Sequence, residues 1–212
     1  MTDPTAESAR DDLAFVRALV SEGGQTQAVL GEALFGAGLC YGIQCVLQGI
    51  LAAGPGEYVP WQIHLAVGVL PTVFFLVLIT RIMIRERGQS QHGVGTRAVN
   101  AAFGGAGLAA MTTAVIFGWL ATRWHSMEVF LIHPMMVCVV QGTVWYIAFA
   151  IRRRGWFGLV SLGWFIAALA LAFALGSGGP TVGPLFLAIL SAAMLGLLAL
   201  PGWALWKGAA RA

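Results

Sequence analysis

Long apolar segments alternate with short polar segments along most of this chain. The apolar segments lie at about 29–53, 61–83, 98–122, 127–151, 156–176 and 182–206. An α-helix of about 20 residues crosses the hydrocarbon layer of a bilayer, which is roughly 30 Å thick. The pattern therefore predicts an all-α membrane protein with six transmembrane helices, arranged as three helix hairpins.

Composition supports residence in a membrane. Of 212 residues, 58% are hydrophobic and 10% are charged, whereas an ordinary soluble domain has about 25% charged residues. Residues 1–22 are polar and lack the apolar stretch of a signal peptide, so the first apolar segment is expected to remain in the protein. The net charge of +3 is interpreted as a topology signal, and no nucleic-acid partner is expected.

Basic residues predict the orientation of the helices. Of the 12 lysines and arginines, only Arg123 lies in the first, third or fifth connection between apolar segments. Cytoplasmic loops of membrane proteins carry an excess of Lys and Arg, so both termini of this multi-pass membrane protein are predicted to be cytoplasmic. Residues 1–28 then form a cytoplasmic segment, 29–206 the transmembrane bundle and 207–212 a cytoplasmic tail.

The segment from Ser8 to Gly23 has the spacing of an amphipathic helix. Its apolar face consists of Leu13, Phe15, Val16, Leu19 and Val20. We expect this helix to end at Gly23-Gly24. It is predicted either to lie on the membrane interface or to bind a cytoplasmic or membrane protein partner through the apolar face.

The chain also matches itself at a spacing of 69 residues. This shift places Gly36-Ala37-Gly38-Leu39 on Gly105-Ala106-Gly107-Leu108, His64 on His133, and Arg85 on Arg154. Matches at the start, middle and end of a helix pair indicate duplication of a two-helix unit. Copies that each cross the membrane twice keep one orientation, unlike the inverted repeats of many transporters.

Histidines and carboxylates gather on the side opposite the basic connections. They are Glu57, His64, His125, Glu128 and His133. Ionisable groups in or beside a bilayer are costly and are candidates for function. If His64 and His133 face each other, they can hold copper, zinc or haem iron, and the other three residues can complete the metal site.

Two other interpretations of these histidines remain open. Each ring can form a hydrogen bond with a neighbouring helix, or it can titrate between about pH 5 and 8 in a proton-linked role. No HxxxH, HExxH or CxxC spacing favours a metal site. Cys40, Cys45 and Cys138 lie within apolar segments and are interpreted as small buried residues.

Small and polar residues within the spans predict how the helices pack. Gly38 and Gly42 form a GxxxG pair, which indicates close packing inside the bundle or, alternatively, a homo-oligomer seam. Glu32 is expected to cap the start of the first span, and Gln44, Gln48 and Gln141 to bond across helices. The prolines expected to remove backbone hydrogen bonds are Pro71, Pro134 and Pro201.

The N-terminal motif Asp12-Leu-Ala-Phe-Val-Arg17-Ala-Leu-Val-Ser-Glu22-Gly23, followed by a glycine-rich first span, resembles the start of a group of uncharacterised small bacterial inner-membrane proteins. The motif covers about a tenth of the chain. The resemblance implies a multi-span bundle of unknown function in the bacterial inner membrane and carries over no active-site residues.

Three functions are consistent with these observations. The first is a non-enzymatic integral membrane protein, such as a sensor, regulator or accessory subunit, because no catalytic set is recognisable. The second is a metal- or haem-binding membrane protein that uses His64 and His133. The third is a small-solute channel or transporter whose outer mouth carries the Glu and His residues.

Overall fold

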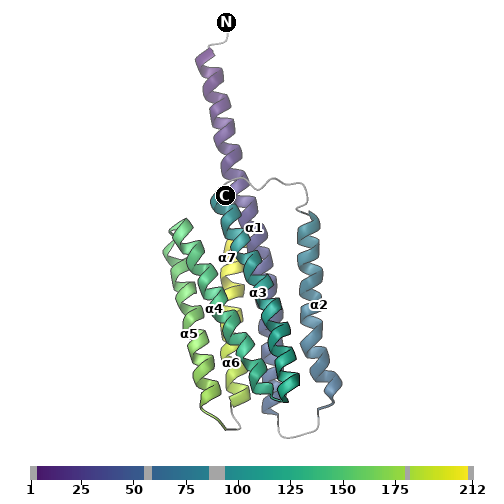
Figure 1. Cartoon of the computed structure of the whole chain (residues 1–212). Coiled ribbons are helices and arrows are strands. Elements are labelled where there is room, and N and C mark those ends of the chain that lie inside the picture. The colour runs from purple at the N-terminus through teal and green to yellow at the C-terminus, as the bar shows by residue number, and fades with distance from the viewer. Residues whose placement is uncertain (1–3, 55–58, 86–93, 180–181, 210–212) are drawn as a thin grey trace.

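The computed structural model describes the backbone of residues 4–54, 59–85, 94–179 and 182–209, and the side chains of 27–54, 59–85, 95–179 and 182–208. Within these ranges the elements are all helical (Figure 1). They are α1 (Pro4–Ala53), α2 (Trp61–Arg85), α3 (Val94–Trp124), α4 (Met127–Arg152), α5 (Gly155–Gly176), α6 (Val182–Ala193), the π-helical segment η1 (Met194–Ala199) and α7 (Leu200–Ala209).

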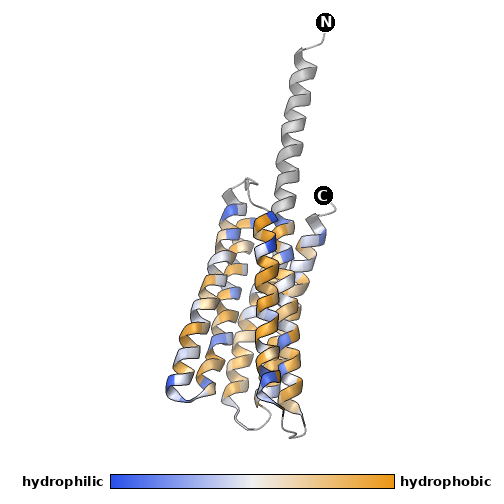
Figure 2. Cartoon of the chain, turned by 90° about the vertical axis from the view of Figure 1, so that its right-hand side faces the viewer, coloured by the Kyte–Doolittle hydropathy of each residue, from blue (hydrophilic) through white to orange (hydrophobic). Residues whose placement is uncertain are grey.

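Six helical stretches are long and apolar enough to cross a membrane, as the sequence predicts. They are Gln27–Ala53, Trp61–Arg85, Gly95–Trp124, Met127–Arg152, Gly155–Gly176 and Val182–Gly208. The last stretch combines α6, η1 and α7. Figure 2 shows that hydrophobic residues predominate along the length of the bundle. The multi-pass membrane character therefore follows from helix length and composition.

The helix ends lie at two opposite ends of the bundle (Figure 1). α1, α3 and α5 end where α2, α4 and α6 begin, and α7 ends on the opposite side. The first span therefore begins, and the last span ends, at the same end of the bundle, as an even number of spans requires. Which end faces the cytoplasm remains a prediction from the arginines.

The prediction that Gly23-Gly24 ends the N-terminal helix is wrong. α1 continues without a break from Pro4 to Ala53. Glycine weakens a helix by about 1 kcal/mol, but unlike proline it keeps its backbone N–H and causes no steric clash. Two glycines therefore permit a helix end without imposing one, and the N-terminal segment and the first span form a single helix.

α1 is the central packing element of the bundle. It packs against α2, α6, η1 and α7, while α4 packs against both α3 and α5. The contact between α4 and α5 is as extensive as that between α3 and α4, so the division into three hairpins remains a prediction. α2 lies at the periphery, and Ile82 is its one buried residue among those described. The fully buried side chains lie on the other helices and include Cys138, Trp145, Trp164, Leu171 and Phe186.

Glycines allow α1 to approach the last span closely. A Cβ atom on Gly38 would lie 2.7 Å from Cα of Ala199, and one on Gly42 would lie 2.6 Å from Cδ2 of Leu195. Because real Cβ atoms do not come this close to backbone atoms, Gly38 needs to be glycine as the structure stands, whereas a side chain at position 42 would require the Leu195 side chain to move. The GxxxG pair is thus used inside the bundle, as the first of the two sequence interpretations expects.

The π-helical segment η1 ends two residues before Pro201. Proline has no N–H to donate to the preceding turn, so the carbonyl of Leu197, four residues earlier, loses its ordinary helical donor. The indole Nε1 of Trp164 in α5 donates a hydrogen bond to this carbonyl at 3.2 Å. The buried side chain of Trp164 thus supplies the hydrogen-bond donor that this carbonyl lacks, which the lipid tails of a bilayer cannot supply.

Candidate functional site

His64, on the first turn of α2, forms a hydrogen-bonded pair with Gln48 of α1. Its Nδ1 lies 3.4 Å from Oε1 of Gln48, and Nε2 of Gln48 donates to the backbone carbonyl of His64 at 3.2 Å. His64 itself is exposed. Its contacts are therefore those of a residue that ties α2 to its neighbour.

His133, on α4, contacts α3. Its Nδ1 lies 3.1 Å from Oγ1 of Thr113, and the ring of Phe130 packs against the imidazole with centroids 5.8 Å apart. His133 is half-buried between these groups. Each of the two histidines lies on the second helix of a sequence-adjacent pair and contacts the first helix, as the interpretation of hydrogen bonding to a neighbouring helix expects.

The structure does not combine these residues into a metal site. His64 bonds to α1 and His133 bonds to α3, and helices α2 and α4 do not pack extensively against each other. Among the described residues, no three His, Cys, Asp or Glu side chains could hold a metal ion together. Glu57 lies outside the described residues.

His125 and Glu128 lie in the turn between α3 and α4 and in the first turn of α4, respectively. His125 is exposed and occupies the turn between α3 and α4 with a φ of 50°, a left-handed conformation that histidine adopts more readily than most residues. Glu128 is exposed in the first turn of α4, where a carboxylate interacts favourably with the helix dipole.

The prediction that Glu32 caps a helix is wrong because α1 begins far upstream of it. Instead, Oε2 of Glu32 lies 2.6 Å from Nη2 of Arg85 at the end of α2. The side chains are 21% and 54% exposed, respectively, so solvent or headgroups screen the pair. The ion pair fastens α2 to α1 at one end of the bundle, and His64 with Gln48 fastens it at the other.

Three amide side chains place oxygen atoms in the bundle interior. The oxygens of Gln44, Asn100 and Gln141 are buried and have no hydrogen-bond partner among the described residues. The expectation that Gln44 and Gln141 bond across helices is therefore not met by their oxygens, whereas Gln48 does bond to His64. Buried oxygens of this kind are where bound water is expected.

The residues predicted to bind a partner lie on α1. They are Leu13, Phe15, Val16, Leu19 and Val20. The structure shows this segment as helical, as the spacing predicts. Their side chains lie outside the described ones, so the apolar face and its use in docking remain predictions.

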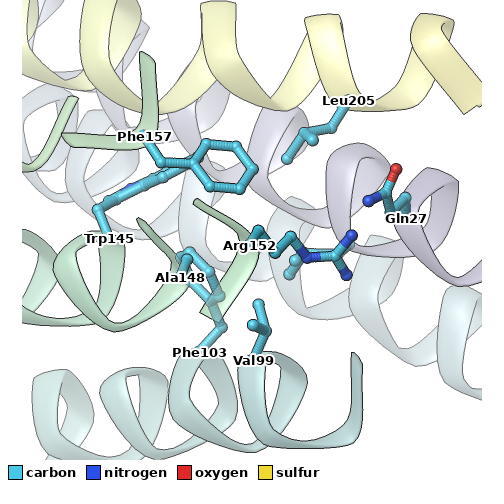
Figure 3. A pocket seen from close by; sticks show the side chains of 9 residues that line it. Gln27, Val99, Phe103, Trp145, Ala148, Arg152, Phe157 and Leu205 are labelled. Atoms are coloured by element: carbon cyan, nitrogen blue, oxygen red, sulfur yellow. The ribbon is translucent and has the colours of Figure 1, made fainter. Parts of the chain in front are cut away.

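A small cavity of about 10 Å³ lies near the end of the bundle where α4 ends. Five helices line it through Gln27, Leu30, Val99, Phe103, Trp145, Ala148, Arg152, Phe157 and Leu205, and we call it the Arg152 cavity. Figure 3 shows the guanidinium of Arg152 extending toward Gln27, with Trp145 and Phe157 on the other side. Nε1 of Trp145 is buried and has no partner among the described residues.

The sequence prediction missed this cavity because it treated Arg152 only as one of three consecutive topology signals. A spacing of seven residues brings Cys138, Trp145 and Arg152 onto one face of α4. Cys138 and Trp145 are both fully buried, and Arg152 continues their row. That spacing is the signal in the sequence that could have distinguished Arg152 from its two neighbours.

Comparison with protein-family models, with curated proteins and with solved structures finds no match for this chain.

Proposed function

We propose that this chain is a non-enzymatic integral protein of the bacterial inner membrane that acts as a sensor, regulator or accessory subunit. One observation carries the proposal: the segment that bears the partner-binding face is continuous with the central helix of the bundle. Binding at the N-terminal part of α1 would act directly on the helix that packs against α2, α6 and α7. The positive-inside rule supports a cytoplasmic position for this segment.

The proposal is tested with serine substitutions on α1. We expect Leu13→Ser, Val16→Ser and Val20→Ser together to release a protein that co-purifies with the full-length chain in mild detergent, because the apolar face supplies the contact. Support requires that the captured protein, identified by mass spectrometry, also recovers this chain when the partner carries the affinity tag.

A matched control carries Ala14→Ser and Ala18→Ser, which lie about 100–140° around the helix from Leu13. This variant should retain the partner. If both variants retain the partner equally and function normally in cells, the apolar face of the N-terminal segment does not bind the partner.

A small-solute channel is the second candidate, and the buried amide oxygens of Gln44, Asn100 and Gln141 favour it. Unpartnered polar groups inside a bundle are sites where water or a polar solute can bind. Flux of a small polar solute into proteoliposomes tests this candidate. Gln141→Leu should lower the flux and Leu162→Ala, on an exposed position of α5, should not. Equal flux in the two variants would show that Gln141 does not line the route that the solute takes through the protein.

A further inference from the structure

Among the described residues, α2 and α3 are the one pair of consecutive spans that does not pack together extensively. Every other span packs against the next, and the last span packs against the first. In their most apolar stretches, 0% of the residues of α2 and 6% of those of α3 are buried, against at least 28% in each of the other four spans. Both helices therefore keep a face that the rest of the chain does not cover.

An uncovered face of α2 carries large, uncharged side chains at heptad spacing. Steps of four and three residues alternate along it, which is the spacing by which one helix packs lengthwise on another. Four of its six members are 46–64% exposed, and the other two are partly exposed. We call this face the α2 stripe, and it consists of Leu65, Val69, Thr72, Leu76, Ile79 and Met83.

A face of α3 carries mainly small residues at the same spacing. We call it the α3 stripe, and it consists of Asn100, Gly104, Gly107, Met111, Ala114 and Gly118. Nothing lies within 4 Å of a Cβ atom added to Gly104 or Gly107. In the 69-residue repeat, Gly107 corresponds to Gly38, which is in contact with the backbone of Ala199 in the last span. A position that receives a helix in the first copy of the repeat thus receives none in the second.

The two stripes have complementary shapes. When α2 and α3 lie antiparallel with Met83 beside Asn100, a large residue faces glycine or alanine at four of the six levels. The four pairs are Leu65 with Gly118, Val69 with Ala114, Leu76 with Gly107, and Ile79 with Gly104. Small residues at such levels let two membrane helices approach closely, so the stripes suit each other.

We propose that the chain forms a two-fold symmetric dimer in which the α2 stripe of each copy packs on the α3 stripe of the other. Within one chain, α2 is held on α1 at both ends, by Arg85 with Glu32 and by His64 with Gln48, and it leaves its own α3 uncovered. A second copy related by an axis along the membrane normal covers all four stripes at once. The proposal does not depend on the docking role of the N-terminal segment.

The area of the stripes is sufficient for a specific dimer. Each stripe extends over 18 residue steps, or about 27 Å of helix, and is about 10 Å wide. The four stripes together therefore bury about 1,100 Å², which is close to the 1,000 Å² or so that a specific interface needs.

The first test is disulfide cross-linking between two full-length chains that carry different tags and have alanine at their three native cysteines. One chain carries Leu76→Cys and the other carries Gly107→Cys. Oxidation in native membranes should join the two tags, because a disulfide forms only where the two Cβ atoms lie about 4 Å apart. The tags distinguish a bond between copies from a bond within one chain.

Phe74→Cys paired with Gly107→Cys is the matched control. Phe74 is 68% exposed and lies at nearly the same depth as Leu76, but about 160° around α2 from it. This pair should give at least about fivefold less cross-linked product. Equal yields from the two pairs would indicate random collision and would overturn the proposal. A disulfide that forms only within a chain carrying both Leu76→Cys and Gly107→Cys would also overturn it, since α2 would then close on its own α3.

The second test measures dimerisation of the full-length protein in a mild detergent by native mass spectrometry. Gly107→Leu should raise the Kd of the dimer at least about tenfold, because the side chain keeps the two helices apart, whereas alanine, already present at position 114, is small enough to fit. Gly105→Leu is the control and should change the Kd less than about twofold, since Gly105 lies about 160° around α3 from Gly107.

Neither leucine variant should impair folding, because nothing lies within 4 Å of a Cβ atom added at either position. Equal weakening of the dimer by the two variants would overturn the proposal. A protein that stays monomeric at every concentration, with no cross-linked product between the tags in membranes, would show that lipid covers the stripes and would overturn it as well.

Discussion

Gly31 of α1 and Gly202 of α7 are in backbone contact where the first and last spans cross. A Cβ atom on Gly31 would lie 2.7 Å from the carbonyl oxygen of Gly202, and one on Gly202 would lie 2.9 Å from the carbonyl oxygen of Gly31. Backbone atoms cannot move aside as a flexible side chain can. The crossing therefore fixes the distance between the two helices.

Substitution of Gly202 by alanine should destabilise the protein by about 1–3 kcal/mol, the usual cost of overpacking a tight contact. Gly107→Ala is the control because nothing lies within 4 Å of a Cβ atom added there. The control should be neutral or slightly stabilising, since alanine favours helix. Unfolding in mixed detergent and SDS micelles measures both. An equal loss of stability in the two variants would show that the crossing is not constrained.

Trp164 and Pro201 should be energetically coupled through the carbonyl of Leu197. Trp164→Phe removes the indole donor and leaves the carbonyl buried, at an expected cost of about 1–3 kcal/mol. In a Pro201→Ala background the new backbone N–H can bond to that carbonyl, so the same substitution should cost less. A double-mutant cycle measures the coupling, and identical costs in both backgrounds would argue against it.

His64 and His133 should behave as independent residues because each bonds to a different helix. The stability changes caused by His64→Gln and His133→Gln should add within about 0.5 kcal/mol in the double variant. The purified protein, expressed with haem and metals present, should show no Soret band and no stoichiometric copper or zinc. An interaction energy between the two substitutions above about 0.5 kcal/mol, or one bound metal ion per chain, would support the metal-site hypothesis instead.

Cysteine labelling should find the two ends of the bundle on opposite sides of the membrane. His125 and Arg153 are both exposed and lie at opposite ends of α4. In cells, His125→Cys should react with a membrane-impermeant maleimide from outside, and Arg153→Cys should react only after the membrane is opened. The parent for this test has alanine at Cys40, Cys45 and Cys138. Labelling of Arg153→Cys in intact cells would contradict the predicted orientation.

The sequence predicts the spans well because their signal is simple. Each of the six helical stretches coincides with one of the predicted apolar segments, since an uncharged segment long enough to cross the hydrocarbon layer is easily recognised in a sequence. The internal use of Gly38 and Gly42 was also predictable, because small residues at this spacing let helices approach.

Features that depend on which helix faces which could not be predicted in the same way. The partner of Glu32 is Arg85, 53 residues later in the chain, and only the packing of α2 on α1 brings them together. The sequence also could not show that His64 bonds to α1 and His133 to α3, since the repeat relates their positions but does not say which helices pack together. In the sequence, Arg152 cannot be distinguished from Arg153 and Arg154 unless the buried face of α4 is known.

The unbroken course of α1 has a geometric consequence. Residues 4–26 continue α1 for about 35 Å, and Figure 1 shows this part of the helix projecting from the end of the bundle. If a helix of that length is rigid, a tilt of about 5° at its base displaces its N-terminal end by about 3 Å. Gly31 and Gly202 hold α1 against α7 near the base of this extension. A change in that contact would alter the angle of the extension, and the resulting displacement would be largest at its N-terminal end.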